Sequence, residues 1–175
     1  MITAVVLAAG ASTRFGSPKQ RVLLEPVLER VRGSAEVGEI VVVLGAHEVE
    51  TSERVVRCRD WERGPGSSLR CGLEALGPDV DAAVVVLGDG PFLDPRAIDR
   101  VVAAWREGAG DVVAPTYGGV RLHPVLIARA AWNDVPDTGL RAVPAALVPC
   151  DDLEPPGDVD FADDVEKGWP PRNPE

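Results

Sequence analysis

Short runs of β-branched and other apolar residues recur along the chain and alternate with segments whose apolar residues have helical spacing. Continuous apolar runs of this length are typical of strands buried on both faces of a parallel sheet. The predicted strands are residues 4–7, 40–44, 55–58, 83–87 and 111–114. The predicted helices are residues 22–32, 68–76 and 95–107. This alternation predicts a doubly wound α/β sheet, in which ligands bind at the carboxyl ends of the strands.

The pattern changes after residue 114. Gly118 and Gly119 separate two apolar segments, residues 112–117 and 120–123, and such a pair predicts a hairpin with a tight turn. Pro124 begins a further apolar segment. The remaining expected elements are a strand at 125–128, a helix at 140–147, a strand at 147–150 and a closing helix at 161–167. The fold class is therefore α/β, with a mostly parallel sheet and a β-hairpin insertion near residues 112–128.

Length and composition narrow the class of protein. A chain of 175 residues is most simply one domain, which we expect to cover residues 1–168, followed by a loose proline-rich tail at 169–175. The net charge of −10 argues against a nucleic-acid or anionic-membrane partner, since either would need a basic face. No apolar run is long enough to cross a bilayer and no signal peptide is recognisable, so we expect a cytoplasmic location.

The three cysteines, Cys58, Cys71 and Cys150, show no CxxC spacing. An odd number without that spacing argues against disulfides and against a zinc site. We therefore expect free thiols, as in a reducing cytoplasm.

The first predicted strand leads directly into a loop rich in Gly, Ala and Ser that carries Gly10, Arg14, Gly16 and Lys19. Small residues let backbone N–H groups approach a phosphate, and the cations neutralise its charge. The chain has sixteen Arg but only two Lys, and one of these stands in this loop. The spacing fits neither a Walker A loop nor a dinucleotide fingerprint. A glycine-rich turn with surface cations has the same local pattern, so the loop alone leaves both interpretations open.

A second candidate follows the strand at 83–87, where the chain reads Gly88-Asp89-Gly90-Pro91. A carboxylate at the carboxyl end of a central strand suits Mg²⁺, which takes one or two carboxylates and completes its shell with phosphate oxygens and water. The alternative is that Asp89 simply begins a turn.

Two further motifs are weaker. Ser67 and Ser68, followed by Arg70, open a predicted helix whose N-terminus could bind a phosphate or a base edge, or the serines could merely cap the helix. Asp158 and Asp160 form a DxD pair that could supply a second metal ligand or be a solvated surface pair.

The only histidines are His47 and His123. We expect His47 to begin a helix in a capping or surface role, and for His123 a packed, hydrogen-bonded imidazole is the simplest role. No Ser/His/Asp or Cys/His arrangement stands out, which leaves covalent nucleophilic catalysis without support.

Five segments in the same order resemble the family of molybdenum-cofactor nucleotidylyltransferases, the MobA/MocA-like NTP transferases. That family shows LAAGxSxRMGxxK, SSLRxGL, LGDxP, HPV and a late DxDTPEDL. This chain has LAAGASTRFGSPK from Leu7, SSLRCGL from Ser67, LGDGP from Leu87, HPV from His123 and DVDFADD from Asp158. The resemblance extends over nearly the whole chain.

The resemblance implies a Rossmann-like, three-layer α/β/α domain that binds an NTP. It assigns Arg14 and Lys19 to the phosphates as catalytic cations. The nucleotide would contact Leu7, Ala8, Ala9, Gly10, Ser12, Gly16, Ser67, Ser68 and Arg70. Asp89 would bind Mg²⁺ together with Asp158 or Asp160, and His123 would contact the acceptor. The LAAG version of the first motif resembles the cytidylyl branch more than the guanylyl branch, which points to CTP.

The expected reaction is the transfer of a nucleotidyl group to a phosphorylated acceptor such as molybdopterin, with release of pyrophosphate. The attacking phosphate oxygen is already an oxyanion, so the reaction needs no general base. The alternatives are a relative that uses GTP or another NTP with a sugar phosphate or another small phosphate acceptor, and a non-catalytic nucleotide-binding chaperone or regulator of a molybdoenzyme partner.

The chain departs from the family pattern mainly on the acceptor side. Phe15 replaces Met, the segment after Lys19 is shortened, and Leu122 stands where a Gly precedes HPV. Phe161 and Ala162 replace Thr-Pro in the last motif. These changes affect the expected identity of the acceptor more than the expected binding of the NTP.

Overall fold

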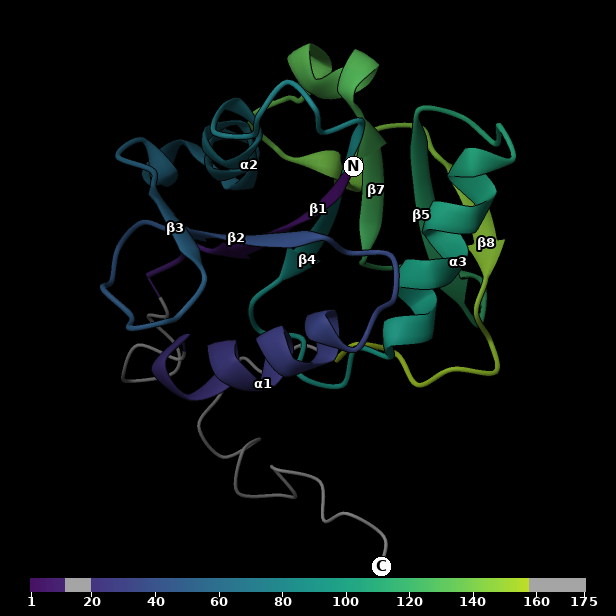
Figure 1. Ribbon diagram of the computed structural model, residues 1–175, viewed down its shortest axis with the longest axis horizontal. Coiled ribbons are helices and arrows are strands. Elements are labelled where there is room, and N and C mark those ends of the chain that lie inside the picture. Colours follow the sequence, from purple (N-terminus) through teal and green to yellow (C-terminus); the bar gives the residue numbers. More distant parts are fainter. Residues whose placement is uncertain (12–19, 158–175) are drawn as a thin grey trace, which may run out of the picture.

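The structure is a computed structural model, and it describes residues 1–11 and 20–157. Within these ranges the chain forms an eight-stranded sheet flanked by helices (Figure 1). The strands are β1 (Ile2–Ala8), β2 (Glu39–Leu44), β3 (Arg54–Arg57), β4 (Ala82–Leu87), β5 (Val112–Tyr117), β6 (Val120–Arg121), β7 (Val125–Ala128) and β8 (Ala146–Pro149). The closing helix expected at 161–167 and the tail at 169–175 lie outside the described residues.

The sheet is mostly parallel, as the sequence predicts. Its strand order is β3-β2-β1-β4-β7-β5-β6, and β8 pairs with β5. Strands β1 to β4 run parallel to one another, β7 is antiparallel to both β4 and β5, and β8 is parallel to β5. Strands β5 and β6 form the expected hairpin around Gly118 and Gly119, which both have the positive φ that this tight turn requires.

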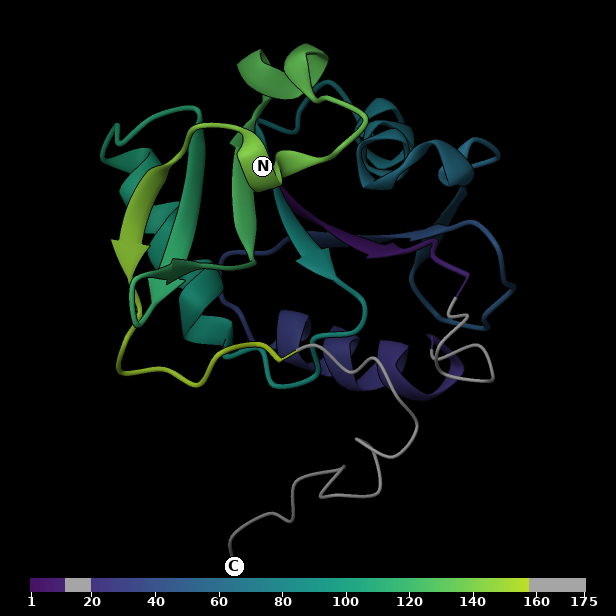
Figure 2. The ribbon, with the colours of Figure 1, turned by 180° about the vertical axis from the view of Figure 1, so that it is seen from behind.

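Helices cover both faces of the sheet and give the predicted three layers. Helices α1 (Gln20–Arg32) and α3 (Pro95–Arg106) pack on one face, and α2 (Pro65–Glu74) packs on the other (Figures 1 and 2). Gly72 of α2 lets this helix approach closely, because a Cβ there would lie 2.7 Å from a methyl group of Val5 on β1. No helix in the described ranges is long and apolar enough to cross a membrane.

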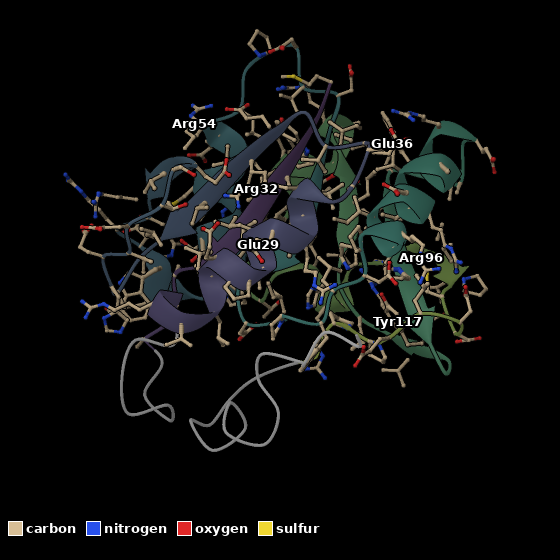
Figure 3. The ribbon with its side chains drawn as sticks, turned by 60° about the horizontal axis from the view of Figure 1, so that its bottom comes forward. Glu29, Arg32, Glu36, Arg54, Arg96 and Tyr117 are labelled. Carbon is tan, nitrogen blue, oxygen red and sulfur yellow. A yellow bond between two sulfur atoms is a disulfide. The ribbon has the colours of Figure 1, made fainter. Side chains whose placement is uncertain are left out.

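The rim beside α1 is polar. Arg32, at the end of α1, donates to both Glu25 and Glu53 at 2.6 Å, and these ion pairs are partly exposed. Figure 3 shows Arg32 between α1 and the neighbouring strand edge. Exposed pairs of this kind are each worth less than about 1 kcal/mol, so the fold depends mainly on the apolar layers.

Two expected helical features are absent from the described structure. Instead of a helix at 140–147, the chain forms a short 3₁₀ turn, η3 (Leu140–Ala142), followed by β8. Pro144 lacks the N–H that a helix needs, and the following segment completes the sheet by pairing with β5. His47 does not begin a helix either, because residues 45–47 form a bend after β2.

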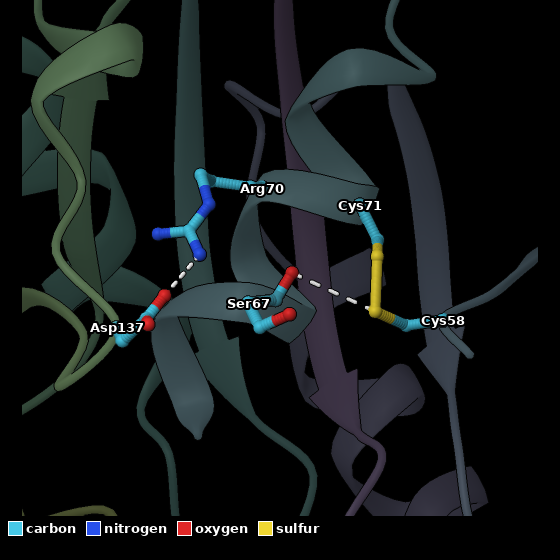
Figure 4. The surroundings of a disulfide bond; sticks show 5 residues. All are labelled: Cys58, Ser67, Arg70, Cys71 and Asp137. Carbon is cyan, nitrogen blue, oxygen red and sulfur yellow. Dashed lines mark hydrogen bonds and ion pairs between the residues drawn. A yellow bond between two sulfur atoms is a disulfide. The ribbon is translucent and has the colours of Figure 1, made fainter. Parts of the chain in front are cut away.

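The expectation of free thiols is wrong for two of the three cysteines. Cys58 and Cys71 form a disulfide, and their Cα atoms are 5.7 Å apart (Figure 4). Cys58 follows β3 and Cys71 lies on α2, two elements that pack together although thirteen residues separate the cysteines in sequence. Cys150 is free and buried.

Candidate active site

The topology brings the ends of β1 and β4, which carry several of the predicted site residues, together at one edge of the sheet. From β1 the chain passes through α1 to β2 on one side, and from β3 it returns through α2 to β4 on the other side. The carboxyl ends of β1 and β4 therefore flank the point at which the strand order reverses. In doubly wound folds this switch point is where ligands bind.

The end of β1 presents its backbone at this edge. The carbonyl oxygen of Leu7 accepts a hydrogen bond from the Gly88 amide at 2.9 Å, and Ala8 ends the strand. Ala9 is buried, whereas Gly10 is exposed, and a Cβ at Gly10 would have no neighbour within 4 Å among the described residues. The backbone at Gly10 is therefore open to a ligand.

Six predicted site residues fall outside the described parts of the chain. They are Ser12, Arg14, Gly16, Lys19, Asp158 and Asp160.

Asp89 lies in a turn directly after β4, as one of the two sequence interpretations expects, and its role as a metal ligand stays a prediction. The turn is close to the end of β1, because a Cβ at Gly88 would lie 3.0 Å from the carbonyl oxygen of Leu7 and 3.2 Å from the Cβ of Ala8. Asp89 itself is partly exposed. The turn that carries Asp89 therefore lies beside the end of β1 at the switch point.

His123 lies beside the same turn. It precedes the cis-proline Pro124, which leads into β7, the antiparallel neighbour of β4. A Cβ at Gly90 would lie 2.6 Å from both Cε1 and Nε2 of the imidazole, so only glycine leaves room for the ring. The expected packed His123 is confirmed, but the expected hydrogen bonds are not found, since neither ring nitrogen has a partner among the described residues.

The burial of His123 decides its charge. The side chain is only 9% exposed, and burial lowers the pKa of the imidazole to about 4, although the nearby Asp89 carboxylate acts to raise it. The ring is therefore neutral near pH 7 and offers one donor and one acceptor.

The last described residues approach the same turn. The amide of Phe92 donates to the carbonyl oxygen of Pro156 at 3.0 Å, and the carbonyl oxygen of Gly157 would lie 3.2 Å from a Cβ at Gly90. The chain therefore passes beside Asp89 and His123 immediately before the sequence reaches the DxD pair.

Ser67 and Ser68 are buried in the first turn of α2, but neither caps the helix, contrary to the sequence expectation. The helix begins at Pro65 with Gly64 as its N-cap residue, and the Gly66 amide donates to the carbonyl oxygen of Asp137 at 2.9 Å. The segment 136–137 thus covers the helix N-terminus.

Arg70 holds the covering segment in place. Its guanidinium donates to the carbonyl oxygen of Val135 at 2.6 Å and forms an ion pair with Asp137 (Figure 4). This hydrogen-bonded pairing also lowers the pKa of Asp137. Arg70 and Cys71 leave α2 on opposite sides, so α2 is tied to segment 135–137 on one side and to the end of β3 on the other.

The sequence profile of the MobA-like NTP transferase domain matches residues 4–148. The chain belongs to this family. The family resemblance is thereby confirmed, as is the Rossmann-like fold that it implied, and the match contains the first four of the five motifs.

Individual relatives of this NTP transferase domain differ in name and length. The chain is 31% identical over 129 residues to the bifunctional protein GlmU of Sorangium cellulosum, a match that covers 63% of this chain and 27% of GlmU. It is 28% identical over 130 residues to a protein named "Probable molybdenum cofactor guanylyltransferase" in Thermococcus sibiricus, covering 69% of this chain and 65% of that protein. The chain thus spans about a quarter of the length of the GlmU relative.

Among solved structures, Rv0371c of Mycobacterium tuberculosis H37Rv is similar over 95% of both chains, with a TM-score of 0.78 and 28% identity. The same protein has also been solved in complex with manganese, and that structure matches with a TM-score of 0.74 and 25% identity over 95% of this chain and 96% of that one. A protein similar in structure to this chain has thus been solved with a divalent metal ion.

Three residues near the loop of this NTP transferase domain gave no clear functional signal in the sequence. Gln20 donates from its side-chain amide to the carbonyl oxygen of Gly10 at 2.7 Å, and His47 Nε2 lies 2.8 Å from the carbonyl oxygen of Ala11. Trp61 packs over Gly45, where a Cβ would lie 2.6 Å from the ring. No local motif marks these contacts, because each joins segments that are distant in sequence.

Proposed function

We propose that the protein is a Mg²⁺-dependent nucleotidyltransferase that joins an NMP, with CTP as the preferred donor, to a phosphorylated cofactor precursor such as molybdopterin. The observation that carries the proposal is the convergence of the open Gly10 backbone, Asp89 and His123 at the switch point of a MobA-like NTP transferase domain. A phosphate oxygen of the acceptor attacks the α-phosphorus of the NTP, and the bond to pyrophosphate breaks.

The described residues suit a reaction without a general base. His123 is neutral near pH 7, and its two buried ring nitrogens have no hydrogen-bond partner among the described residues. The family resemblance implies that this imidazole contacts the acceptor. The nucleotide base would lie against the backbone after β1, with Ser67 and Ser68 nearby. Arg14 and Lys19 would neutralise the triphosphate, a role inferred from the sequence motif. Catalysis then consists of in-line positioning and charge neutralisation.

The residues present fit Mg²⁺. Asp89 is a partly exposed carboxylate at the strand edge, and the chain reaches this turn at Gly157, directly before Asp158 and Asp160. In the described ranges, no group of three or more His, Cys, Asp and Glu side chains gathers to hold a metal. Such a donor set suits Mg²⁺, which needs only one or two carboxylates when phosphate oxygens complete its shell. When bound, Mg²⁺ would neutralise charge on the triphosphate.

The nucleotide preference has two candidates. The LAAG form of the first motif supports CTP. The Thermococcus relative, which is named as a guanylyltransferase, supports GTP as the alternative donor. Leu122 and the shortened segment after Lys19 favour the other alternative, a nucleotide-binding protein without catalytic activity. The experiment below includes this as one of its outcomes.

The test is the thermal stability of the purified full chain with each of ATP, CTP, GTP and UTP, with and without MgCl₂. A ligand that binds only the folded state raises the Tm with the logarithm of its concentration over Kd. We expect a Mg²⁺-dependent rise that is largest with CTP, followed by pyrophosphate release when molybdopterin is supplied. Asp89→Asn should abolish the Mg²⁺-dependent part, whereas the exposed control Asp134→Asn should retain it. No rise with any NTP would refute the proposal.

A further inference from the structure

The backbone that follows β1 is held by hydrogen bonds from two other segments of the chain. Three successive carbonyl oxygens each accept a hydrogen bond from a residue distant in sequence. The pairs are Ala46 N–H with Ala9 (3.1 Å), Gln20 Nε2 with Gly10 (2.7 Å) and His47 Nε2 with Ala11 (2.8 Å). Since a carbonyl oxygen can only accept, the proton of the His47 imidazole lies on Nε2.

These contacts determine where the amide groups point. In a planar trans peptide, the carbonyl group and the following N–H point in opposite directions. Fixing the Ala9 carbonyl therefore directs the Gly10 N–H away from Ala46, and fixing the Gly10 carbonyl directs the Ala11 N–H away from Gln20. No backbone carbonyl in the described parts of the chain accepts a hydrogen bond from either amide. Within the described ranges, these two amides are therefore not used in hydrogen bonds to other backbone groups.

Packing by itself does not hold this backbone. Gly10 is exposed, and no atom of the described residues lies within 4 Å of a Cβ placed there, so packing against those residues restricts its backbone little. Glycine loses more conformational freedom on ordering than any other residue. The hydrogen bonds from Gln20 and His47 supply the restraint that neighbouring side chains do not.

The two side-chain donors are themselves well positioned. Gln20 is only 4% exposed at the first residue of α1, so its amide has little freedom. His47 is partly buried and follows the Gly45–Ala46 segment, which is held between the Ala9 carbonyl and Trp61. Each donor thus holds the backbone of Gly10 and Ala11 at a fixed place relative to α1 or to the end of β2.

We propose that Gln20 and His47 are positioning residues for nucleotide binding: they orient the peptide groups after β1 so that the Gly10 and Ala11 amides face the nucleotide. This inference rests on the proposed function. Neither side chain needs to touch the nucleotide. A pre-oriented pair of amides spares the ligand the cost of ordering the loop, and so it raises affinity without adding a contact.

The test compares variants of the full chain by the Kd for CTP with MgCl₂ and by the Tm without nucleotide. Each variant removes a neutral hydrogen bond to the backbone after β1, and we expect His47→Ala and Gln20→Ala each to raise the Kd about 3- to 10-fold while the Tm without nucleotide changes little. His47→Gln keeps a side-chain N–H donor and should restore the Kd to within about twofold of wild type. The controls are Glu50→Ala, near His47, and Glu29→Ala, on the exposed face of α1 (Figure 3), which should leave the Kd unchanged.

The outcomes separate this inference from the proposed function. If the wild-type chain binds none of the four NTPs, the proposed function fails and the inference fails with it. If the wild type binds CTP or another NTP and the alanine variants bind it equally well, the positioning role alone is refuted. The positioning role would also be refuted if the alanine variants lost affinity together with a clear fall in Tm and His47→Gln did not restore the affinity. The contacts would then only stabilise the fold.

Discussion

Replacing Gly66 by alanine tests whether segment 136–137 covers the start of α2. Alanine at a helical position normally stabilises a protein by roughly 1 kcal/mol relative to glycine. Here, however, a Cβ would lie 1.7 Å from the carbonyl oxygen of Pro136, whereas real Cβ contacts essentially never fall below 3.0 Å. The obstructing atom belongs to the backbone, so the covering segment itself would have to move by roughly 1 Å or more.

The movement would break contacts whose combined value exceeds the gain in helix propensity. The Gly66 amide would lose its bond to Asp137, worth about 1 kcal/mol. Arg70 would lose its charged hydrogen bond to the Val135 carbonyl, worth roughly 1.5–3 kcal/mol, and an exposed ion pair to Asp137 worth less than about 1 kcal/mol. We therefore expect a net destabilisation of roughly 2 kcal/mol.

The assay is thermal and urea unfolding followed by circular dichroism. A loss of that size lowers the Tm of a chain of this length by about 4–8 °C. The matched control is Gly77→Ala, where a Cβ would meet only Oδ1 of Asp79 at 2.7 Å, the end of an exposed side chain that can rotate. If Gly66→Ala were as stable as wild type, or more stable, the covering of α2 by segment 136–137 would be wrong.

Three further predictions concern other contacts. Cys71→Ser removes a cross-link between residues thirteen apart, and the free energy of unfolding measured in urea should fall by about 3 kcal/mol. Dithiothreitol should lower the stability of the wild type by the same amount and leave that of the variant unchanged. The ion pair with Arg100 lowers the pKa of Asp152 to about 2. The ion pair therefore contributes fully to the free energy of unfolding above about pH 4, and this contribution is lost as the pH falls through about 2. Asp152→Asn should flatten this part of the profile of stability against pH. Gly45→Ala places a Cβ 2.7 Å from the Ala9 carbonyl oxygen and should weaken CTP binding in a titration, and unchanged affinity would contradict the restraint on this loop.

Several elements could be predicted because their signals are local. The apolar runs of β1, β2 and β4 have no polar face, which is the pattern of central parallel strands, and the structure buries almost all of their residues. Helix α3 begins with Asp94 accepting from the Arg96 amide, a cap followed by proline in the first turn. These signals depend on neighbouring residues alone.

Other predictions failed because a distant segment competed with the local preference. The region after Leu140 has helical composition in part, but β5 offers a free edge that β8 fills, and Pro144 interrupts any helix. Cys58 and Cys71 lack a disulfide-like spacing, yet packing of α2 beside β3 brings them together. Ser67 and Ser68 do not cap α2, since the helix begins earlier and segment 136–137 covers its first turn.

The sequence by itself determined the alternation of strands and helices, the hairpin at Gly118-Gly119 and the family motifs, because periodicity, turn chemistry and short motifs are properties of adjacent residues. Only the tertiary structure decided that His123 is neutral and lies near Asp89, that Arg70 binds the 135–137 segment, and that Gln20 and His47 hold the backbone after β1. Each of these features depends on burial or on hydrogen bonds between segments that the sheet topology brings together. Desolvation and long-range contacts have no signature in neighbouring residues, and so they can be assigned only once the chain has folded.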